Sequence, residues 1–298
     1  MLSSSECITW FAAVLIVSVA IVTVNLLSIM ILFIKNSDLR TRGMYLVINL
    51  TVADTLVGAI SSLQFLRFSS TKCKNANSLN VRFTWERYVI TWFIFYWFPL
   101  TSLTSITVIS LERMHATFRP FRHRVIKKWV YGVTISMVWV LAGMISTAIL
   151  MLHLFDKEWS HRQFLSQSYC LLCLSIICAC YASVIVKICC GVRPQHHGAA
   201  RRQRKLTVTL LIMTFVSLLL WIPYAIATFV FHTTDSIRSL PFTKGMRLNL
   251  SLLLLFYINS FVNPVVYTIR MPEYRKALQL LFTRRQRQNA AAIPLRAR

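Results

Sequence analysis

The chain has 298 residues and a net charge of +24; 56% of its residues are hydrophobic and 14% are charged. Soluble domains are about 45–50% apolar, so the composition indicates a membrane protein. The basic residues lie between long apolar runs, so membrane topology explains the charge better than nucleic-acid binding does.

Apolar stretches of about twenty residues cross a ~30 Å hydrocarbon core as α-helices. Segments of about ten alternating residues, which would indicate a β-barrel, are absent from the sequence. The predicted fold class is therefore an all-α membrane protein, a seven-transmembrane helix bundle. The predicted spans lie at about 10–34, 44–67, 88–112, 129–152, 164–190, 206–231 and 247–269.

The charges of the connections predict the orientation. Connections 116–128 and 187–205 carry several Lys and Arg residues and no acid, and the tail after Arg270 is basic too. The positive-inside rule then places the N-terminus outside and the tail in the cytosol. The predicted organisation is an extracellular N-terminus (1–9), a membrane domain of seven spans (10–269) and a cytoplasmic segment (270–298).

Two of the eight cysteines, Cys7 and Cys73, fall in the predicted outer segments, where the environment is oxidising. A disulfide between them is one interpretation, and two free thiols is the other, because a sequence gives no distance. Most of the remaining cysteines lie in the fifth span, where a free thiol behaves as a small apolar side chain.

The third span ends in a charged pair, Glu112 and Arg113. A pair at that depth favours a functional role, in which the arginine exchanges its acid partner for another. The alternative is an arginine that only marks the end of the helix by reaching toward water.

Asp54 lies in the middle of the second span, where an ionised carboxylate needs a partner. Side-chain oxygens of neighbouring spans would complete a site for a small monovalent cation or water. The alternative is that these groups only hydrogen-bond the helices to one another. The set is Asp54, Ser102, Asn259 and Asn263.

Short motifs recur in order along the spans. They include Asn25, the NLTVAD segment that ends at Asp54, Glu112-Arg113-Met114, Trp221-Ile222-Pro223-Tyr224 and the NPVVY segment 263–267. Over about 25–278 the chain resembles the rhodopsin-like (class A) G-protein-coupled receptors. Tyr88 stands where that family usually has an outer cysteine, an absence that favours the melanocortin, lysophospholipid, cannabinoid and adenosine group.

The resemblance implies a seven-transmembrane receptor domain over 10–269 and a short amphipathic eighth helix with the tail over 270–298. It implies a plasma-membrane receptor that binds an extracellular ligand and activates heterotrimeric G proteins by outward movement of the sixth helix. It also implies contact with membrane lipids, a match of the Asp54 set to the family's sodium pocket, no other cofactor and no enzymatic activity. The implied activation residues are Glu112, Arg113, Tyr181, Trp221, Pro223, Asn263, Pro264 and Tyr267.

The candidate ligand pocket is aromatic and nearly uncharged, which favours an apolar or weakly polar ligand. Phe95 occupies the position of the aspartate of amine receptors, so a simple biogenic amine is disfavoured. A peptide on the outer loops and ordinary aromatic packing are the alternatives. The pocket residues are Phe95, Tyr96, Tyr169, Tyr224, Thr228 and Tyr257, with Trp221 below them.

Other function classes find less support. A transporter or channel would show an internal repeat or several charges along one route, and neither is present in the sequence. A membrane enzyme would show a catalytic motif such as H-E-x-x-H or G-x-S-x-G, which the chain lacks. A decoy receptor of the same fold that does not signal remains the closest alternative.

Overall fold

The structure, a computed structural model, describes residues 3–34, 43–72, 85–155, 159–190 and 241–270, with separate pieces between 208 and 230 and between 274 and 279. The described residues form helices joined by short connections. The helices are α1 (Ser4–Ile34), α2 (Met44–Lys72), α3 (Trp85–Phe118), α4 (Pro120–Val125), α5 (Lys128–Phe155), α6 (Trp159–Cys190) and α9 (Phe242–Arg270).

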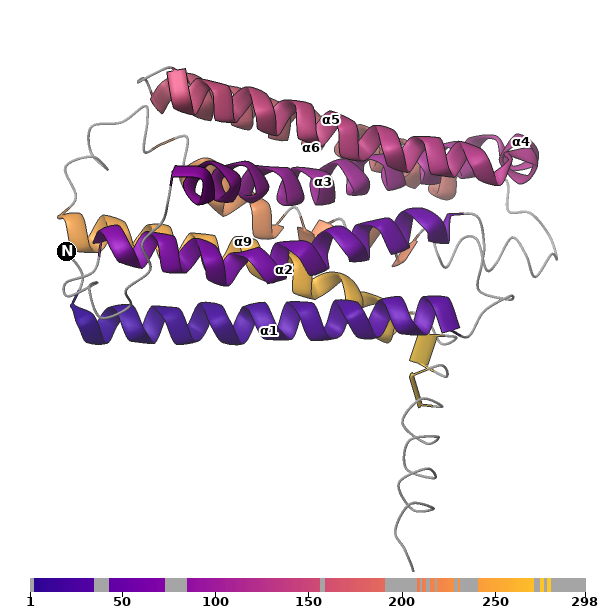
Figure 1. The fold of residues 1–298 in the computed structure, drawn as a ribbon. Helices are drawn as coiled ribbons and strands as arrows, with labels where there is room; N and C mark the ends of the chain where they lie inside the picture. The colour runs from indigo at the N-terminus through magenta and orange to yellow at the C-terminus, as the bar shows by residue number, and fades with distance from the viewer. Residues whose placement is uncertain are drawn as a thin grey trace, which may run out of the picture.

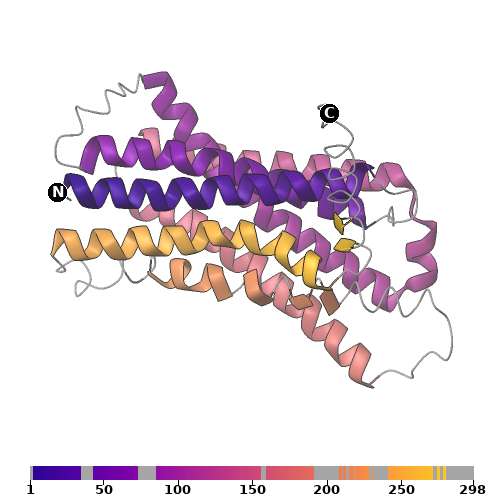
Figure 2. The same cartoon turned by 90° about the horizontal axis from the view of Figure 1, so that it is seen from below.

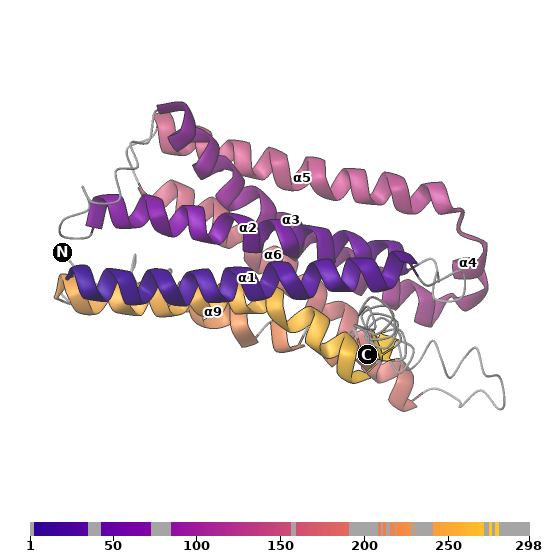
Figure 3. The ribbon, with the colours of Figure 1, turned by 60° about the horizontal axis from the view of Figure 1, so that its bottom comes forward.

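The long helices run side by side as one bundle (Figure 1). α3 runs between α2 and α5 and also packs against α6 (Figure 3). α1 packs against α2 and α9, and the view from below shows α1 and α9 alongside each other (Figure 2). Six helices in the described part of the chain are long and apolar enough to cross a membrane.

Each long described helix overlaps its predicted span and extends beyond it by up to six residues; α1 begins at Ser4, six residues before the expected start at 10. A capping box explains the early start. The backbone N–H of Glu6 donates to Ser3 Oγ at 3.2 Å, and the backbone N–H of Ser3 donates to Glu6 Oε2 at 3.1 Å. The polar first turn of α1 is stabilised by these capping hydrogen bonds, so apolar periodicity does not reveal it.

Three more predicted segments can be compared with the structure. The predicted connection 116–128 contains the short helix α4, which is too brief to show a helical period. The sixth predicted span, 206–231, is described in pieces that include an apolar helix over Phe215–Ala227. Of the predicted eighth helix, Tyr274, Arg275, Leu278 and Gln279 are described, and all four are helical.

Helix α3 carries hydroxyl groups through the middle of the bundle. Thr101, Thr104, Ser105, Thr107 and Ser110 are all buried, and each donates its hydroxyl to a carbonyl one turn earlier at 2.6 to 2.9 Å. A buried hydroxyl that is bonded within its own helix avoids the cost of an unsatisfied polar group. The polar helix can therefore occupy a central position away from water.

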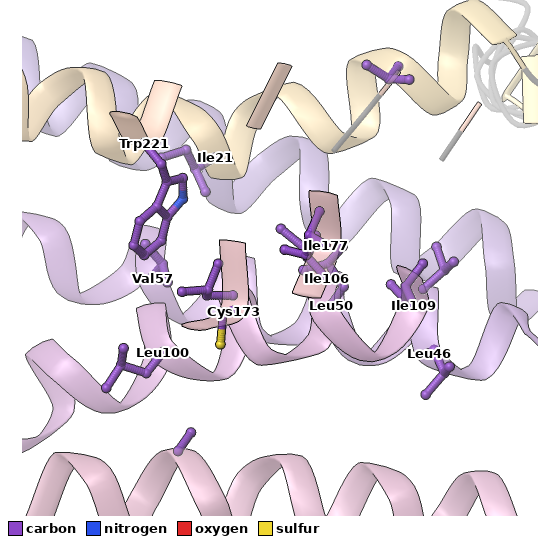
Figure 4. Packing of buried hydrophobic residues seen from close by; sticks show 14 of the residues in the cluster. Ile21, Leu46, Leu50, Val57, Leu100, Ile106, Ile109, Cys173, Ile177 and Trp221 are labelled. Atoms are coloured by element: carbon purple, nitrogen blue, oxygen red, sulfur yellow. The ribbon is translucent and has the colours of Figure 1, made fainter. Parts of the chain in front are cut away.

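The apolar core joins α1, α2, α3 and α6 with the Trp221 segment (Figure 4). Between helices in a membrane, close packing stabilises contacts more than exclusion of water does, because lipid tails are themselves apolar. Gly58 on α2 shows this packing, since a Cβ there would lie 2.7 Å from Ile21 Cγ2 on α1. Core residues that Figure 4 labels are Ile21, Leu46, Leu50, Val57, Leu100, Ile106, Ile109, Cys173, Ile177 and Trp221.

Candidate functional site: an ion pair at one end of α3 and a carboxylate in the middle of the bundle

The charged pair at the C-terminal end of α3 is formed. Arg113 is 2% exposed and makes a salt bridge to Glu112, which is 10% exposed. His123 of α4 places its Nε2 2.6 Å from the other oxygen of Glu112, Oε1. The hydroxyl of Tyr131 on α5 lies 3.3 Å from the same nitrogen. Glu112 therefore lies between an arginine of its own helix and a histidine of the next one.

The guanidinium of Arg113 packs against Gly43. A Cβ on Gly43 would lie 2.0 Å from Arg113 Nη2 and 2.9 Å from Glu112 Oε1. Arg113 Nη1 is buried and has no hydrogen-bond partner among the described residues. A buried donor of this kind carries a desolvation cost that a new acceptor would relieve.

Asp54 on α2 is completely buried and accepts three hydrogen bonds. Ser102 of α3 and Ser260 of α9 donate to Oδ1 at 2.8 Å each, and Asn263 of α9 donates its Nδ2 to Oδ2 at 2.6 Å. Ser102 and Asn263 belong to the predicted set, whereas Ser260 does not. Its spacing of three residues from Asn263 places both on one face of a helix, and that spacing was the available signal.

Amide oxygens also lie in the middle of the bundle. Asn259 Oδ1, Asn263 Oδ1 and Asn25 Oδ1 are buried and have no hydrogen-bond partner among the described residues. The amide nitrogen of Asn25 donates to the backbone oxygen of Ser260 at 3.0 Å, which ties α1 to α9. A carboxylate and amide oxygens are hard ligands of the kind that small cations take.

A second amide network joins three helices. Asn49 of α2 donates its Nδ2 to Ser105 Oγ on α3 at 2.8 Å, and it accepts from Trp139 Nε1 on α5 at 2.8 Å. Both groups of the asparagine side chain are thus satisfied. This network fixes the spacing of α2, α3 and α5 between the two candidate sites.

The predicted pocket residues divide into groups. Phe95 and Tyr96 on α3 pack edge to face with ring centroids 5.0 Å apart. Trp221 and Tyr224 both pack against Phe256 of α9, at 4.7 and 5.2 Å. Tyr257 is 1% exposed and also contacts Phe256. Phe256, which the sequence analysis did not select, thus brings Trp221, Tyr224 and Tyr257 together, whereas Phe95 and Tyr96 pair with each other.

Tyr169 is held separately, because its hydroxyl bonds Thr104 Oγ1 at 2.6 Å. Thr228 lies outside the described residues. A groove of about 630 Å³ lies between α3 and α5, and residues that line it include Trp97, Trp139, Gly143 and Met144. The groove shares no residue with the predicted ligand pocket.

The remaining activation residues are placed as follows. Tyr181 is buried on α6, Pro223 is half-buried, and Pro264 is buried within α9. Tyr267 lies in α9, but its side chain is outside the described part of the structure. Cys7 is disulfide-bonded, and Cys73 lies outside the described residues. The six described cysteines of α6 are free.

A cluster at the N-terminal end of α3 was not predicted. His153 of α5 stacks near Trp92 with centroids 4.2 Å apart, and its Nε2 lies 2.8 Å from the Tyr88 hydroxyl. Arg162 of α6 donates to His153 Nδ1 and lies 5.9 Å from the Trp92 ring centroid. We call Tyr88, Trp92, His153 and Arg162 the aromatic clamp. It joins α3, α5 and α6 near the position where the family's usual cysteine is replaced by Tyr88.

Comparison with known proteins identifies the family. Residues 24–267 match the 7 transmembrane receptor (rhodopsin family) profile. The chain is 24% identical over 284 residues to neuropeptides B/W receptor type 1 of Rattus norvegicus, which covers 85% of this chain and 80% of that receptor. It is 25% identical over 203 residues to somatostatin receptor type 2 of Mus musculus, covering 60% of this chain and 53% of that receptor.

The chain thus spans about half the length of the somatostatin receptor and about four fifths of the neuropeptide receptor. A 5-hydroxytryptamine receptor of Lymnaea stagnalis is 36% identical over 88 residues, 29% of this chain and 16% of that receptor. The predicted family and fold class are confirmed, whereas the narrower subgroup stays a prediction. The profile covers most of the chain and includes both candidate sites, so this chain belongs to the rhodopsin family of seven-transmembrane receptors.

Proposed function

We propose that the chain is a plasma-membrane receptor that binds an extracellular ligand and activates heterotrimeric G proteins. In this proposal the N-terminus is extracellular and the α4 end of the bundle faces the cytosol. Exposed bases at that end, among them Arg119, Arg122, Lys127 and Lys128, support the orientation through the positive-inside rule.

The buried Glu112–Arg113 ion pair is the observation that carries the proposal. A buried charge at a membrane boundary is costly unless it is paired. An arginine that can exchange one acid partner for another can therefore act as a switch. Ligand binding that favours an arrangement without the pair would free Arg113 for a transducer surface. Outward movement of the sixth span, around Pro223, would open the space for that contact.

The relatives set the ligand panel. Somatostatin, neuropeptides B/W and galanin are peptide ligands in the names of matched receptors, and 5-hydroxytryptamine is an amine. Phe95 at the amine position favours the peptides over the amine. The aromatic residues around Phe256 add apolar ligands to the classes that a screen should include.

The test is G-protein activation in cells that express the chain or Arg113→Ala at matched surface level. A panel of peptides, lipids and nucleosides is applied, and nucleotide exchange is measured for each G-protein class. We expect a response that requires Arg113. A receptor at the surface that activates no G protein with any ligand, and has no basal activity, would favour the decoy alternative instead.

We also propose that the middle of the bundle binds a sodium ion. Asp54 supplies the negative charge, and the buried oxygens of Asn259 and Asn263 are available as neutral ligands. Among the described residues, no group of three or more His, Cys, Asp or Glu side chains is placed to hold a metal ion. A bound cation would offset the cost of the buried carboxylate and favour the resting arrangement.

Thermal unfolding of purified receptor tests the sodium site. We expect wild type to unfold at a higher temperature in sodium chloride than in the chloride of a bulky organic cation at equal ionic strength. Asp54→Asn keeps the size of the side chain and removes its charge, so the difference should vanish. Equal unfolding temperatures for wild type in both salts would exclude sodium binding at this site.

A further inference from the structure

His123 of α4 contacts the ion pair at the end of α3, although it lies outside the Glu112-Arg113-Met114 motif. His123 Nε2 lies 2.6 Å from Glu112 Oε1, while Arg113 pairs with the other oxygen, Oε2. A carboxylate only accepts hydrogen bonds, so Nε2 carries the proton and donates it. Each oxygen of Glu112 is thus bound by a different partner, one from α3 and one from α4.

His123 can hold this position because α4 is itself anchored. The backbone N–H of Arg119 donates to His115 O at 2.9 Å, and that of His123 donates to Arg119 O at 3.0 Å. Two backbone hydrogen bonds thus link the end of α3 to α4 through Arg119. His123 is 14% exposed and packs against Tyr131 of α5 at its hydroxyl.

The ion pair alone does not fix Glu112, because neighbouring residues 112 and 113 point to different sides of a helix. Adjacent helical positions are about 100° apart, so the two side chains must bend toward each other. A second donor on the far side of the carboxylate restricts it to the rotamer that faces Arg113. Such a bond to a charged group is among the stronger hydrogen bonds in proteins.

We propose that His123 is a positioning residue that keeps Glu112 against Arg113 and thereby sets the receptor's activity without ligand. The inference rests on the proposed function, and it adds α4 to the elements that hold Arg113 at rest. Loss of the histidine frees the carboxylate to move away from Arg113. The guanidinium, whose Nη1 is buried without a hydrogen-bond partner among the described residues, then becomes available to a G protein.

The experiment compares wild type with His123→Ala, His123→Gln and Tyr131→Phe. Ligand-independent nucleotide exchange is measured with purified receptor and G protein. We expect His123→Ala to raise the basal rate at least about five-fold, a typical allosteric coupling. The amide of glutamine can donate to Glu112, so His123→Gln should return near the wild-type rate. Tyr131→Phe keeps the ring and removes the hydroxyl that lies 3.3 Å from His123 Nε2, so it should change the basal rate little.

A double variant identifies the route. Arg113→Ala combined with His123→Ala should lose the raised basal rate, because the signal passes through the arginine. A basal rate that is equal in wild type and His123→Ala would overturn the proposal. So would a glutamine variant as active as the alanine variant, since that result would indicate that the imidazole acts by packing.

Backbone hydrogen exchange gives a readout that needs no signalling. We expect the amides of residues 121–126 to exchange faster in purified His123→Ala than in wild type, with His123→Gln close to wild type. If no variant activates any G protein, the proposed function fails, and the exchange data alone then decide on the contact. Unchanged exchange in the alanine variant would overturn the positioning role.

Discussion

The two ends of α3 are each joined to neighbouring helices through a histidine, but the two histidines meet opposite charges. At the Tyr88 end, the ring of His153 accepts from the guanidinium of Arg162, so its Nδ1 has no proton. At the Arg113 end, His123 donates to the carboxylate of Glu112. The first ring lies among aromatic groups and beside a cation, and the second lies beside an anion.

This difference indicates that the two ends of α3 have different roles. The aromatic clamp joins α3, α5 and α6 through ring contacts and two hydrogen bonds. Loss of the charged side chain of Arg162 would remove one of these hydrogen bonds. The Glu112 cluster depends on charges that another partner could satisfy equally well. We therefore expect changes in the clamp to alter stability and changes at Glu112 to alter signalling.

Arg162→Ala should give the largest loss of stability. Arg162 is 7% exposed, and its removal leaves Nδ1 of His153 buried without this donor and takes a cation from the face of Trp92. A buried polar group that loses its partner costs about 1–3 kcal/mol. Thermal unfolding of the purified receptor measures the effect.

Arg247→Ala is the matched control, because Arg247 is 56% exposed and pairs with Glu6 at the surface. Exposed pairs contribute about 0.2–1 kcal/mol. If both arginine variants unfold at the same temperature, the clamp is not a stabilising unit. If Arg162→Ala also raises basal G-protein activation, the separation of roles between the two ends is wrong.

Gly43→Ala tests the other end of α3. Its methyl group would overlap Arg113 Nη2, the far end of a flexible side chain, so the fold can survive while the ion pair is displaced. We expect basal nucleotide exchange to rise several-fold, equivalent to about 1 kcal/mol of coupling. Exchange is measured at matched receptor concentration.

The control for this variant is Gly132→Ala on α5, where no atom lies within 4 Å of an added Cβ. Alanine is favoured over glycine in a helix by about 1 kcal/mol, so this variant should be slightly more stable and signal as wild type does. Equal basal exchange in both glycine variants would show that the pose of Arg113 does not limit activity.

The sequence predicts the parts of this molecule that depend on local pattern. Apolar length is a local property, so it predicted the spans; the motifs contain Glu112, Arg113, Asp54 and Asn263, and Ser102 was selected as a polar residue within a span. The contacts of His123 and Arg162 depend on how distant segments meet. Neither residue belongs to a helical period or a motif, and α4 has only six residues, so no local pattern selects either one.

Tyr88→Phe is the smallest change that still separates the two ends. It removes the hydroxyl that lies 2.8 Å from His153 Nε2, while the ring can keep its contacts with Trp85, Trp92 and His153. One net hydrogen bond is worth about 0.5–1.5 kcal/mol, so we expect a modest fall in unfolding temperature and no change in basal exchange. A Tyr88→Phe variant that signalled differently at unchanged stability would mean that the aromatic clamp, too, takes part in activation.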